Sequence, residues 1–215
     1  MKLILPPALS RRAFLAAGAA AAWAAFPHSL IAGPWQGGGA LAFDGEMLVA
    51  AGERLLRLSL DGGAEEMPAP ARPIRALASV NLASGMGGIW IYAGTETGLT
   101  RVPDCFCRWQ DVVAGDAMDA LVAGAAPAPT APLPAGEPVL ALASAHAAAE
   151  RLHSALPSGL WASVDGGVAW TRQSDLRAAA LAIHPRDPDH IVAATDGGLS
   201  QSRDGGTTWA ALAAI

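Results

Sequence analysis

Lysine is almost absent from this sequence. Lys2 is the one lysine among 215 residues, and 19 acidic side chains outnumber 14 basic ones, which gives a formal net charge of −5. Removal of residues 1–32 would take away Lys2, Arg11 and Arg12 and leave about −8. A surface of this charge does not attract nucleic acid or anionic lipid. The composition therefore predicts no nucleic-acid partner.

Cysteine is also scarce. Cys105 and Cys107 are the only two, and the sequence has no C-x-x-C-H haem motif and no second cysteine pair to complete a zinc site. We therefore expect neither a cofactor nor a metal. In an oxidising compartment two cysteines ordinarily form a disulfide, but a bridge between residues two apart closes a small, strained ring. A local disulfide, two free thiols and a bond to a partner are all open at this stage.

The N-terminus has the pattern of an export signal, a positive stretch followed by an apolar, alanine-rich segment. Its order SRRAFL, with Arg11 and Arg12 followed by Phe14 and Leu15, resembles the twin-arginine signal of bacteria. That resemblance implies export of a folded protein to the periplasm or beyond. Cleavage is expected after residue 24 or 32. An uncleaved segment 13–33 would be long enough to anchor the chain in a membrane, because a span needs about 20 apolar residues. We assign residues 1–32 to the signal and 33–215 to one domain.

An eight-residue segment occurs twice, as SVDGGVAW at 163–170 and as SRDGGTTW at 202–209, 39 residues later. That distance is the length of one supersecondary unit. Segment 59–66 keeps Ser-x-Asp-Gly-Gly without the tryptophan, and segment 102–109 keeps the aspartate and tryptophan around Cys-Phe-Cys. These four segments are termed the Ser–Asp turns. Their shared positions are Ser59, Asp61 and Gly63; Asp104 and Trp109; Ser163, Asp165, Gly167 and Trp170; and Ser202, Asp204, Gly206 and Trp209.

The same order of short segments precedes every Ser–Asp turn. Each copy begins with Ala-Leu-Ala, continues with an apolar stretch, and then reaches a turn and a short segment with a leucine. Short apolar runs separated by turn residues predict strands. In the turn itself, aspartate accepts hydrogen bonds from nearby backbone N–H groups and glycine tolerates positive φ. The tryptophan of the outgoing strand can cover the hairpin. We therefore interpret the eight residues as structural. The Ala-Leu-Ala triplets lie at 40–42, 76–78, 141–143 and 180–182.

Four short strands in each repeat of about 40 residues are typical of a β-propeller blade. The sequence therefore predicts an all-β fold, a small β-propeller of about four four-stranded blades in a closed or partial ring. The Ser–Asp turns resemble the Asp box, or bacterial neuraminidase repeat, of sialidases, sortilin-type receptors, xyloglucan-degrading glycosidases and the photosystem II assembly factor family. The resemblance covers residues 39–213. It implies the fold more than an activity, because the box lies away from the sites of those families.

The copies are unevenly spaced. Successive aspartates lie 43, 61 and 39 residues apart, and the excess falls in the proline- and alanine-rich stretch 114–138. This composition favours an extended loop over a hidden blade. Four blades are the lower limit of the usual range of about 4 to 8. The chain therefore either closes a small ring or forms a partial ring whose edge strands need a cover. Pairing of two chains into an eight-bladed ring is one such arrangement.

No set of residues matches a catalytic centre. A sialidase would need an arginine cluster, a tyrosine nucleophile and an Arg-Ile-Pro element, whereas residues 72–75 here read Arg-Pro-Ile-Arg. Tyr92 is the only tyrosine, and its apolar stretch favours a core position. No spacing indicates the paired carboxylates of other glycosidases.

The histidines give only a weak metal signal. His146, Glu150 and His153 would share one face of a helix and could hold a metal there. The repeat instead places His153 in a strand and residues 145–149 in a loop. The segment from His184 to His190 is expected to be a tight link between two strands.

We therefore expect a non-catalytic exported propeller that binds or assembles another exported or membrane protein, with a homodimer as one form. The alternative is a carbohydrate-active enzyme or a sugar-binding lectin. A sugar site would show an exposed tryptophan beside carboxylates in a central cleft, whereas a scaffold would show an apolar face there. The tryptophans outside the turns are Trp35, Trp90 and Trp161.

Overall fold

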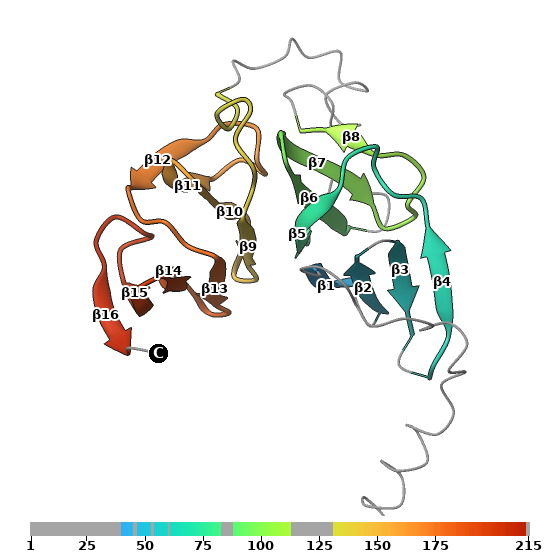
Figure 1. Ribbon diagram of the computed structural model, residues 1–215. Coiled ribbons are helices and arrows are strands. Elements are labelled where there is room, and N and C mark those ends of the chain that lie inside the picture. Colours follow the sequence, from blue (N-terminus) through green and yellow to red (C-terminus); the bar gives the residue numbers. More distant parts are fainter. Residues whose placement is uncertain are drawn as a thin grey trace, which may run out of the picture.

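The computed structural model describes residues 40–44, 47–52, 54–59, 61–82, 88–112 and 131–213, and these form strands and turns without a helix. Sixteen strands build four antiparallel sheets of four strands each, and every sheet follows the chain order (Figure 1). The predictions of an all-β fold and of four-stranded units are confirmed. In these ranges no helix is long and apolar enough to cross a membrane. The predicted export signal lies outside the described residues.

The strands have the following bounds. Sheet I contains β1 (Ala40–Asp44), β2 (Met47–Ala51), β3 (Leu55–Leu58) and β4 (Ala64–Met67). Sheet II contains β5 (Ile74–Val80), β6 (Trp90–Thr95), β7 (Gly98–Pro103) and β8 (Gln110–Asp111). Sheet III contains β9 (Ala141–Ala145), β10 (Ala148–Leu156), β11 (Gly159–Ser163) and β12 (Thr171–Ser174). Sheet IV contains β13 (Ala180–His184), β14 (Asp187–Thr195), β15 (Gly198–Ser202) and β16 (Ala210–Ala213).

The first strand of each sheet carries the Ala-Leu-Ala triplet and lies innermost, around a common centre (Figure 1). These inner strands contact one another in the order β1, β5, β9, β13. Within the described residues no comparable contact joins β13 back to β1, so the four sheets do not close a ring. The two end sheets, I and IV, therefore each have one face without a neighbouring sheet.

The core lies in the three seams, the packed contacts between successive sheets. Because side chains alternate along a strand, each sheet has a forward face toward the next sheet and a backward face toward the preceding one. Backward-facing Leu77, Leu142 and Leu181 belong to the clusters of the first, second and third seams. The forward faces carry the registered trios Ala42, Val49 and Arg57; Ala78, Tyr92 and Arg101; Ala143, His153 and Ala162; and Ala182, Val192 and Gln201.

Two predicted links are shorter in the structure than the sequence suggested. Residues 145–149 are not a loop, because β9 and β10 pair directly from Ala145 to Ala148 around a two-residue turn. The stretch between His184 and His190 is likewise reduced to a turn, since β14 already begins at Asp187. In both places the register of the hairpin continues the strand into residues of low strand propensity, so pairing overrides local preference.

Only the end of the proline- and alanine-rich stretch lies within the described residues. Ala131 forms a parallel bridge with Ala169, and the carbonyl of Ala131 accepts a 2.7 Å hydrogen bond from the Trp170 backbone N–H. Leu133 is buried in the core between sheets II and III. This portion therefore packs along the outer part of sheet III, and residues 114–130 are not described.

Candidate functional site

The third Ser–Asp turn is closed by a network of side-chain to backbone hydrogen bonds. The Ser163 hydroxyl donates to Asp165 Oδ1 over 2.7 Å and accepts from the Gly167 N–H over 2.9 Å. Asp165 Oδ1 also accepts from the N–H groups of Val168 and Ala169 at 3.1 and 2.9 Å. Gly167 has a φ of 89°, a left-handed conformation that glycine adopts without steric cost. The Ser163 hydroxyl and the Asp165 carboxylate are thus both used inside the turn.

The fourth Ser–Asp turn repeats this network. Ser202 donates to Asp204 Oδ1 over 2.8 Å and accepts from the Gly206 N–H over 2.8 Å. The hydroxyl and backbone N–H of Thr208, followed by the Ser202 hydroxyl, lower the pKa of the Asp204 carboxyl to about 2. Asp204 is consequently a carboxylate at neutral pH, and its oxygens serve as acceptors for its own turn.

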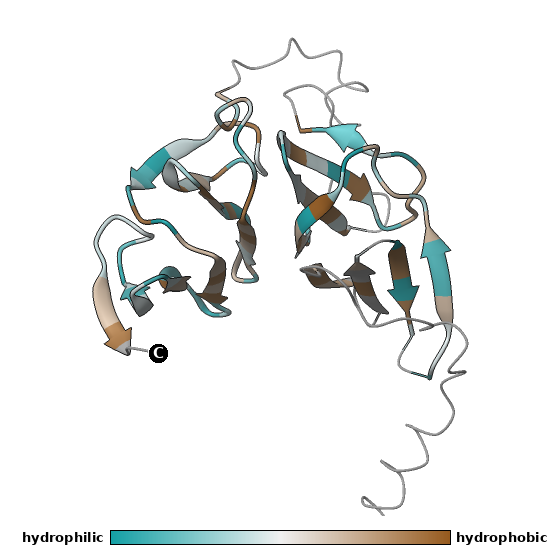
Figure 2. Cartoon of the chain, in the orientation of Figure 1, coloured by the Kyte–Doolittle hydropathy of each residue, from teal (hydrophilic) through white to brown (hydrophobic). Residues whose placement is uncertain are grey.

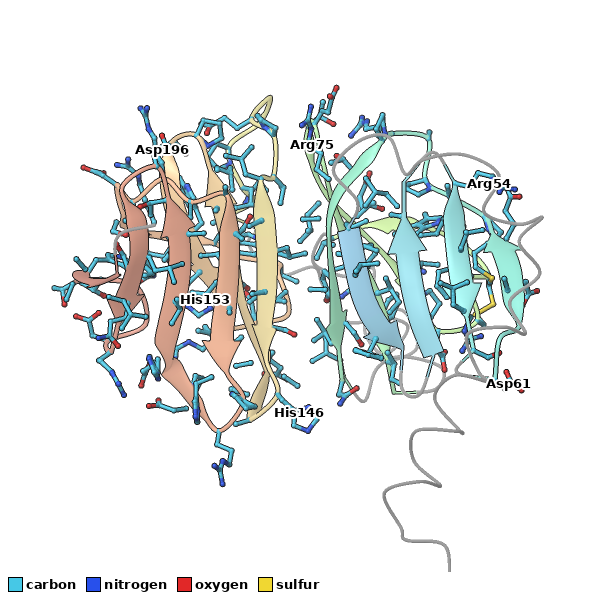
Figure 3. The ribbon with its side chains drawn as sticks, turned by 60° about the horizontal axis from the view of Figure 1, so that its bottom comes forward. Arg54, Asp61, Arg75, His146, His153 and Asp196 are labelled. Carbon is cyan, nitrogen blue, oxygen red and sulfur yellow. A yellow bond between two sulfur atoms is a disulfide. The ribbon has the colours of Figure 1, made fainter. Side chains whose placement is uncertain are left out.

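The first two turns depart from this pattern. In the first, Ser59 donates to Asp61, which lowers the pKa of that exposed carboxyl, and accepts from the Gly63 N–H over 2.9 Å. In the second, which includes Asp104, a disulfide joins exposed Cys105 to Cys107 (Figure 3). Phe106 stands between the two cysteines with a φ of 52°, where the complete copies have their second glycine, and its ring is buried between sheets I and II.

The tryptophans of the turns reach two kinds of partner. Trp170 and Trp209 each donate from Nε1 to the carbonyl of the second glycine of their own turn, over 2.8 and 2.9 Å. Trp209 also reaches Ser174 Oγ at 3.1 Å, at the end of sheet III, and Trp109 donates to the Pro68 carbonyl, after sheet I, over 2.6 Å. These tryptophans therefore tie a turn to the segment that arrives from the preceding sheet. Sheet I has Glu66 at this position, paired with Arg54 at 3.2 Å.

A second set of inter-sheet contacts was not foreseen from the sequence. The Tyr92 hydroxyl of sheet II donates to the Gly166 carbonyl in the turn of sheet III, over 2.7 Å. His153 of sheet III occupies the same repeat position and places Nε2 3.3 Å from the Gly205 carbonyl in the turn of sheet IV. Both side chains are fully buried. The available signal was a polar ring at one fixed position of otherwise apolar stretches.

Arg101 completes the tyrosine contact. Its guanidinium is buried, donates to the Tyr92 hydroxyl over 3.0 Å and lies 4.4 Å from the centre of the Trp90 ring. Burial raises the pKa of the Tyr92 hydroxyl, against the smaller opposing effect of the Arg101 charge. Tyr92 is therefore a neutral phenol in the core, as its apolar surroundings predicted, and no substrate can reach it.

The histidines considered for a metal are not brought together. His153 lies within the buried seam, whereas His146 is exposed in the turn after β9, at one end of the sheet (Figure 3). Burial, and secondarily the Arg151 charge, lower the pKa of the His153 imidazole to about 4. In the described parts of the chain no group of three His, Cys, Asp or Glu side chains has the geometry to hold a metal ion.

The inner strands of all four sheets line one cavity of about 550 Å³, termed the central groove. Its walls are formed mainly by residues 41–43, 77–81, 142–146 and 181–183. Most are Ala, Leu, Ile or Val, and the innermost strands are coloured as apolar in Figure 2. Ser144 bridges two of these strands by donating to the Ser79 carbonyl over 2.8 Å.

The rings among the lining residues of the central groove are those of Phe43 and His146. Neither tryptophan nor a carboxylate is among its lining residues. Trp90 is buried, and half-buried Trp161 donates to Ser158 Oγ over 3.1 Å. Trp35 lies outside the described residues. By the criterion stated for the sequence, the groove has the character of an apolar binding face rather than of a sugar cleft.

A second cavity, of about 590 Å³, lies on the outer part of sheet II beside half-buried Trp109. The exposed residues Arg72, Arg108 and Asp111 contribute polar groups to its wall. In this outer cavity a turn tryptophan lines the wall together with a carboxylate.

No protein-family model matches the chain, and no curated protein matches it. Solved structures do. The GH74 xyloglucanase from Xanthomonas campestris is 16% identical with a TM-score of 0.52, and the match covers 75% of this chain and 26% of that one. The extracellular domain of BT4673 from B. thetaiotaomicron is 14% identical with a TM-score of 0.53, and the match covers 82% of this chain and 22% of that one. An ancestral GH74 enzyme is 14% identical with a TM-score of 0.53, and the match covers 82% of this chain and 24% of that one.

The chain thus spans about a quarter of the length of these proteins. Identities this low relate folds and not activities. Together with the four antiparallel sheets around a common centre, they show that the described part of the chain has a β-propeller-like fold.

Proposed function

We propose that this protein is an exported β-propeller module without catalytic machinery, and that its central groove binds an apolar stretch of another exported or membrane protein. The observation that carries the proposal is the groove itself, where apolar residues of all four inner strands meet. Binding sites are typically concave, largely apolar and supplied with a few polar groups that fix orientation. Ser79, Asn81, Ser144 and His146 are the polar residues of the groove.

The hydrogen bonds of the Ser–Asp turns support a structural role for the residues that recur in the four repeats of this chain. They also support the resemblance to the Asp box. The carboxylate oxygens of Asp165 and Asp204 accept hydrogen bonds from N–H groups of their own turns. The bonds within its turn lower the pKa of Asp204 to about 2, which makes it a poor general acid. Tyr92 is inaccessible in the core. These groups argue for a binding module and against a sialidase.

Export is part of the proposal. The order of Arg11, Arg12, Phe14 and Leu15 supports the twin-arginine pathway, and the Cys105–Cys107 disulfide fits an oxidising compartment. Replacement of Arg11 and Arg12 together by lysine is expected to stop export, because the export machinery reads the arginine pair. The measurement is the amount of protein in periplasmic and cytoplasmic fractions. Normal periplasmic accumulation of the double variant would overturn this part of the proposal.

The groove is tested by site-specific photo-crosslinking in the native cell envelope. A photoreactive phenylalanine analogue replaces His146 or Asn81, two exposed residues of the groove wall, and Ala211 on outer strand β16 serves as the matched control. Both groove positions are expected to capture the same protein, and Ala211 is expected to capture none. The Ile183→Glu variant, which places a charge in the groove at a half-buried residue outside the core clusters, should lower the yield of that adduct.

The opposite result has a clear form. Equal adducts from Ala211 and from the groove positions would indicate a nonspecific surface, and absence of any adduct from the groove would contradict the proposed function. Circular dichroism of each variant shows that the sheets are retained.

A second candidate function rests on the outer cavity. A half-buried tryptophan, two arginines and a carboxylate around about 590 Å³ are groups that can hold a sugar. Titration of soluble oligosaccharides, followed by calorimetry, tests this candidate with the Arg108→Ala and Asp111→Ala variants. Binding that both variants lose would favour a lectin. Hydrolysis of the oligosaccharide would indicate an enzyme.

A further inference from the structure

The backward face of sheet I is exposed where the equivalent faces are covered. Leu41 and Phe43 on β1 are each 61% exposed. Leu77 and Leu142, which occupy the same position as Leu41 in the next two repeats, are each 7% exposed because a preceding sheet packs on them. The difference is one of neighbours and not of residue type, since the triplet is Ala-Leu-Ala in all three cases.

The forward face of sheet IV is exposed in the same sense. Ala180 and Ala182 are exposed, whereas Ala76 and Ala78, the equivalent residues of sheet II, are buried under sheet III. Val192 is half-buried, although its equivalents in the other three sheets are fully buried. Sheet IV therefore exposes small apolar residues on its forward face. Among the described residues, no sheet of the same chain packs on this face.

These two faces have the composition of the two halves of one seam. In every seam of the molecule the alanines of a forward face meet the leucine of a backward face, as Ala76 and Ala78 meet Leu142. Val192 is the equivalent of Val49, which faces the first seam. That seam is closed at Val49 by packing, without the carbonyl contact that Tyr92 and His153 provide in the other two seams. At the Val192 position, sheet IV therefore needs an apolar face, such as Leu41 and Phe43 offer, and not a carbonyl acceptor.

We infer that a second copy of this chain covers both faces. Sheet IV of each copy packs on sheet I of the other, around a two-fold axis, and the two copies together form one ring of eight sheets. A two-fold arrangement buries both faces through two identical contacts and leaves no open end. Eight units lie within the usual range of about 4 to 8 for this architecture. The inference concerns the end faces. Leu41, Phe43 and Ala182 of these faces also line the central groove, but the pairing does not depend on what the groove binds.

The experiment uses two variants with opposite charges. In Phe43→Lys and in Ala182→Glu the altered side chain is exposed in the single chain, so each variant is expected to fold. Light scattering on the exported protein at micromolar concentration should give twice the mass of one chain for the native protein and a single mass for each variant. Val164→Glu, a change at a 73% exposed apolar residue outside both faces, should stay dimeric.

Mixing the two variants is the decisive step. A mixed pair would contain one native contact, between unaltered Ala182 and unaltered Phe43, and one contact between the new lysine and the new glutamate. The equimolar mixture is therefore expected to regain the dimer mass, and its recovery should weaken in high salt.

Four results would overturn the inference. A native protein of single mass would do so, as would a Phe43→Lys variant that stays dimeric, or a mixture that stays monomeric while both variants keep their native circular dichroism. A mass that grows steadily with concentration would indicate an open chain of copies and would also reject the closed pair. A monomer that still forms the groove adduct leaves the proposed function standing, and a dimer without the adduct rejects only that function.

Discussion

The second and third seams are built on the same backbone pattern, yet they differ in what fills them. Between sheets II and III lie Trp90, Tyr92, Leu152 and Trp170, all buried. Between sheets III and IV the buried cluster consists of four alanines, Ala141, Ala155, Ala178 and Ala193, and the large apolar side chains buried nearby are Leu160 and Ile191 at the Gly206 turn. A fully buried large apolar side chain stabilises a fold by about 1.5–3 kcal/mol, and alanine by much less. Seams between sheets of the same strand order therefore need not contribute equally to the stability of the fold.

The polar contacts across these seams differ as well. Tyr92 bonds the Gly166 carbonyl in the second seam, and His153 faces the Gly205 carbonyl in the third. The phenol stays neutral throughout the range in which proteins are usually handled, whereas an imidazole does not. The third seam also has the partly exposed ion pair of Arg151 with Asp189, at 2.7 Å. We expect the third seam to be the weaker one and the one sensitive to acid.

The largest expected effect comes from removing the indole of the second seam. Trp170→Ala should lower the free energy of unfolding by about 3–5 kcal/mol, because the ring is buried and its loss leaves a cavity. Trp209→Ala should cost less, since that ring is only half-buried. Urea unfolding of both variants measures the difference. Equal losses would show that the two seams do not differ as their packing indicates.

Acid should weaken the third seam next. The pKa of His153 is lowered to about 4 in the folded chain, below an unfolded value of about 6.5. The unfolded chain therefore binds a proton that the folded chain does not, and stability is lost as the pH falls from about 6.5 toward about 4. The whole loss is of order 3 kcal/mol, at about 1.4 kcal/mol for each pKa unit.

Urea unfolding at pH 7 and pH 5 tests this dependence. His153→Gln should flatten it, and the matched change His146→Gln at an exposed residue should leave it in place. The pKa of Asp204 is lowered from 3.8 to about 2, so its contribution to stability is lost only as the pH falls from about 3.8 toward about 2. This window lies below that of His153. An unaltered pH dependence in His153→Gln would contradict the prediction.

A smaller effect is expected from the hydroxyl of Tyr92. Tyr92→Phe keeps the ring but leaves the Gly166 carbonyl and the buried Arg101 without this partner. The cost of unsatisfied buried groups is about 1–3 kcal/mol. Thermal unfolding measures it, and Tyr92→Phe should be less destabilising than Trp170→Ala. A variant as stable as the native protein would mean that water replaces the hydroxyl.

Several elements of this fold could be predicted from residues alone. The Ala-Leu-Ala triplets and the spacing of the Ser–Asp turns predicted strands and four-stranded units, because turn chemistry is local and period-two patterns are legible in sequence. The partners of Tyr92 and His153 were not predictable, since each bond joins residues more than 50 positions apart. Whether the ring closes was also beyond the sequence, because closure depends on the small rotation between successive sheets.

The central groove was partly predictable. The Ala-Leu-Ala triplets marked the first strand of each repeat, but the sequence did not indicate that Ser144 and Ser79 would bridge two of these strands. The two-residue turn after Ala145 was missed. The tight link expected after His184 is present but shorter than expected, because cross-strand pairing outweighed the local signals of His, Pro and Arg.

The smallest expected effect concerns the first seam, where Phe106 replaces a glycine between the two cysteines. A disulfide stabilises chiefly by restricting the unfolded chain, and the restriction shrinks with the size of the loop that it closes. Cys105 and Cys107 are two positions apart, and a loop this short gives a contribution of only about 1–2 kcal/mol. The burial of Phe106 in the core of the first seam does not itself require the bond. Reduction with a phosphine, or the double change Cys105→Ser and Cys107→Ser, should therefore lower the midpoint of urea unfolding only slightly and leave the circular dichroism spectrum unchanged. Loss of the folded state on reduction would instead show that the bond holds the left-handed Phe106 in place, and that the first seam depends on it more than the other two depend on their glycine turns.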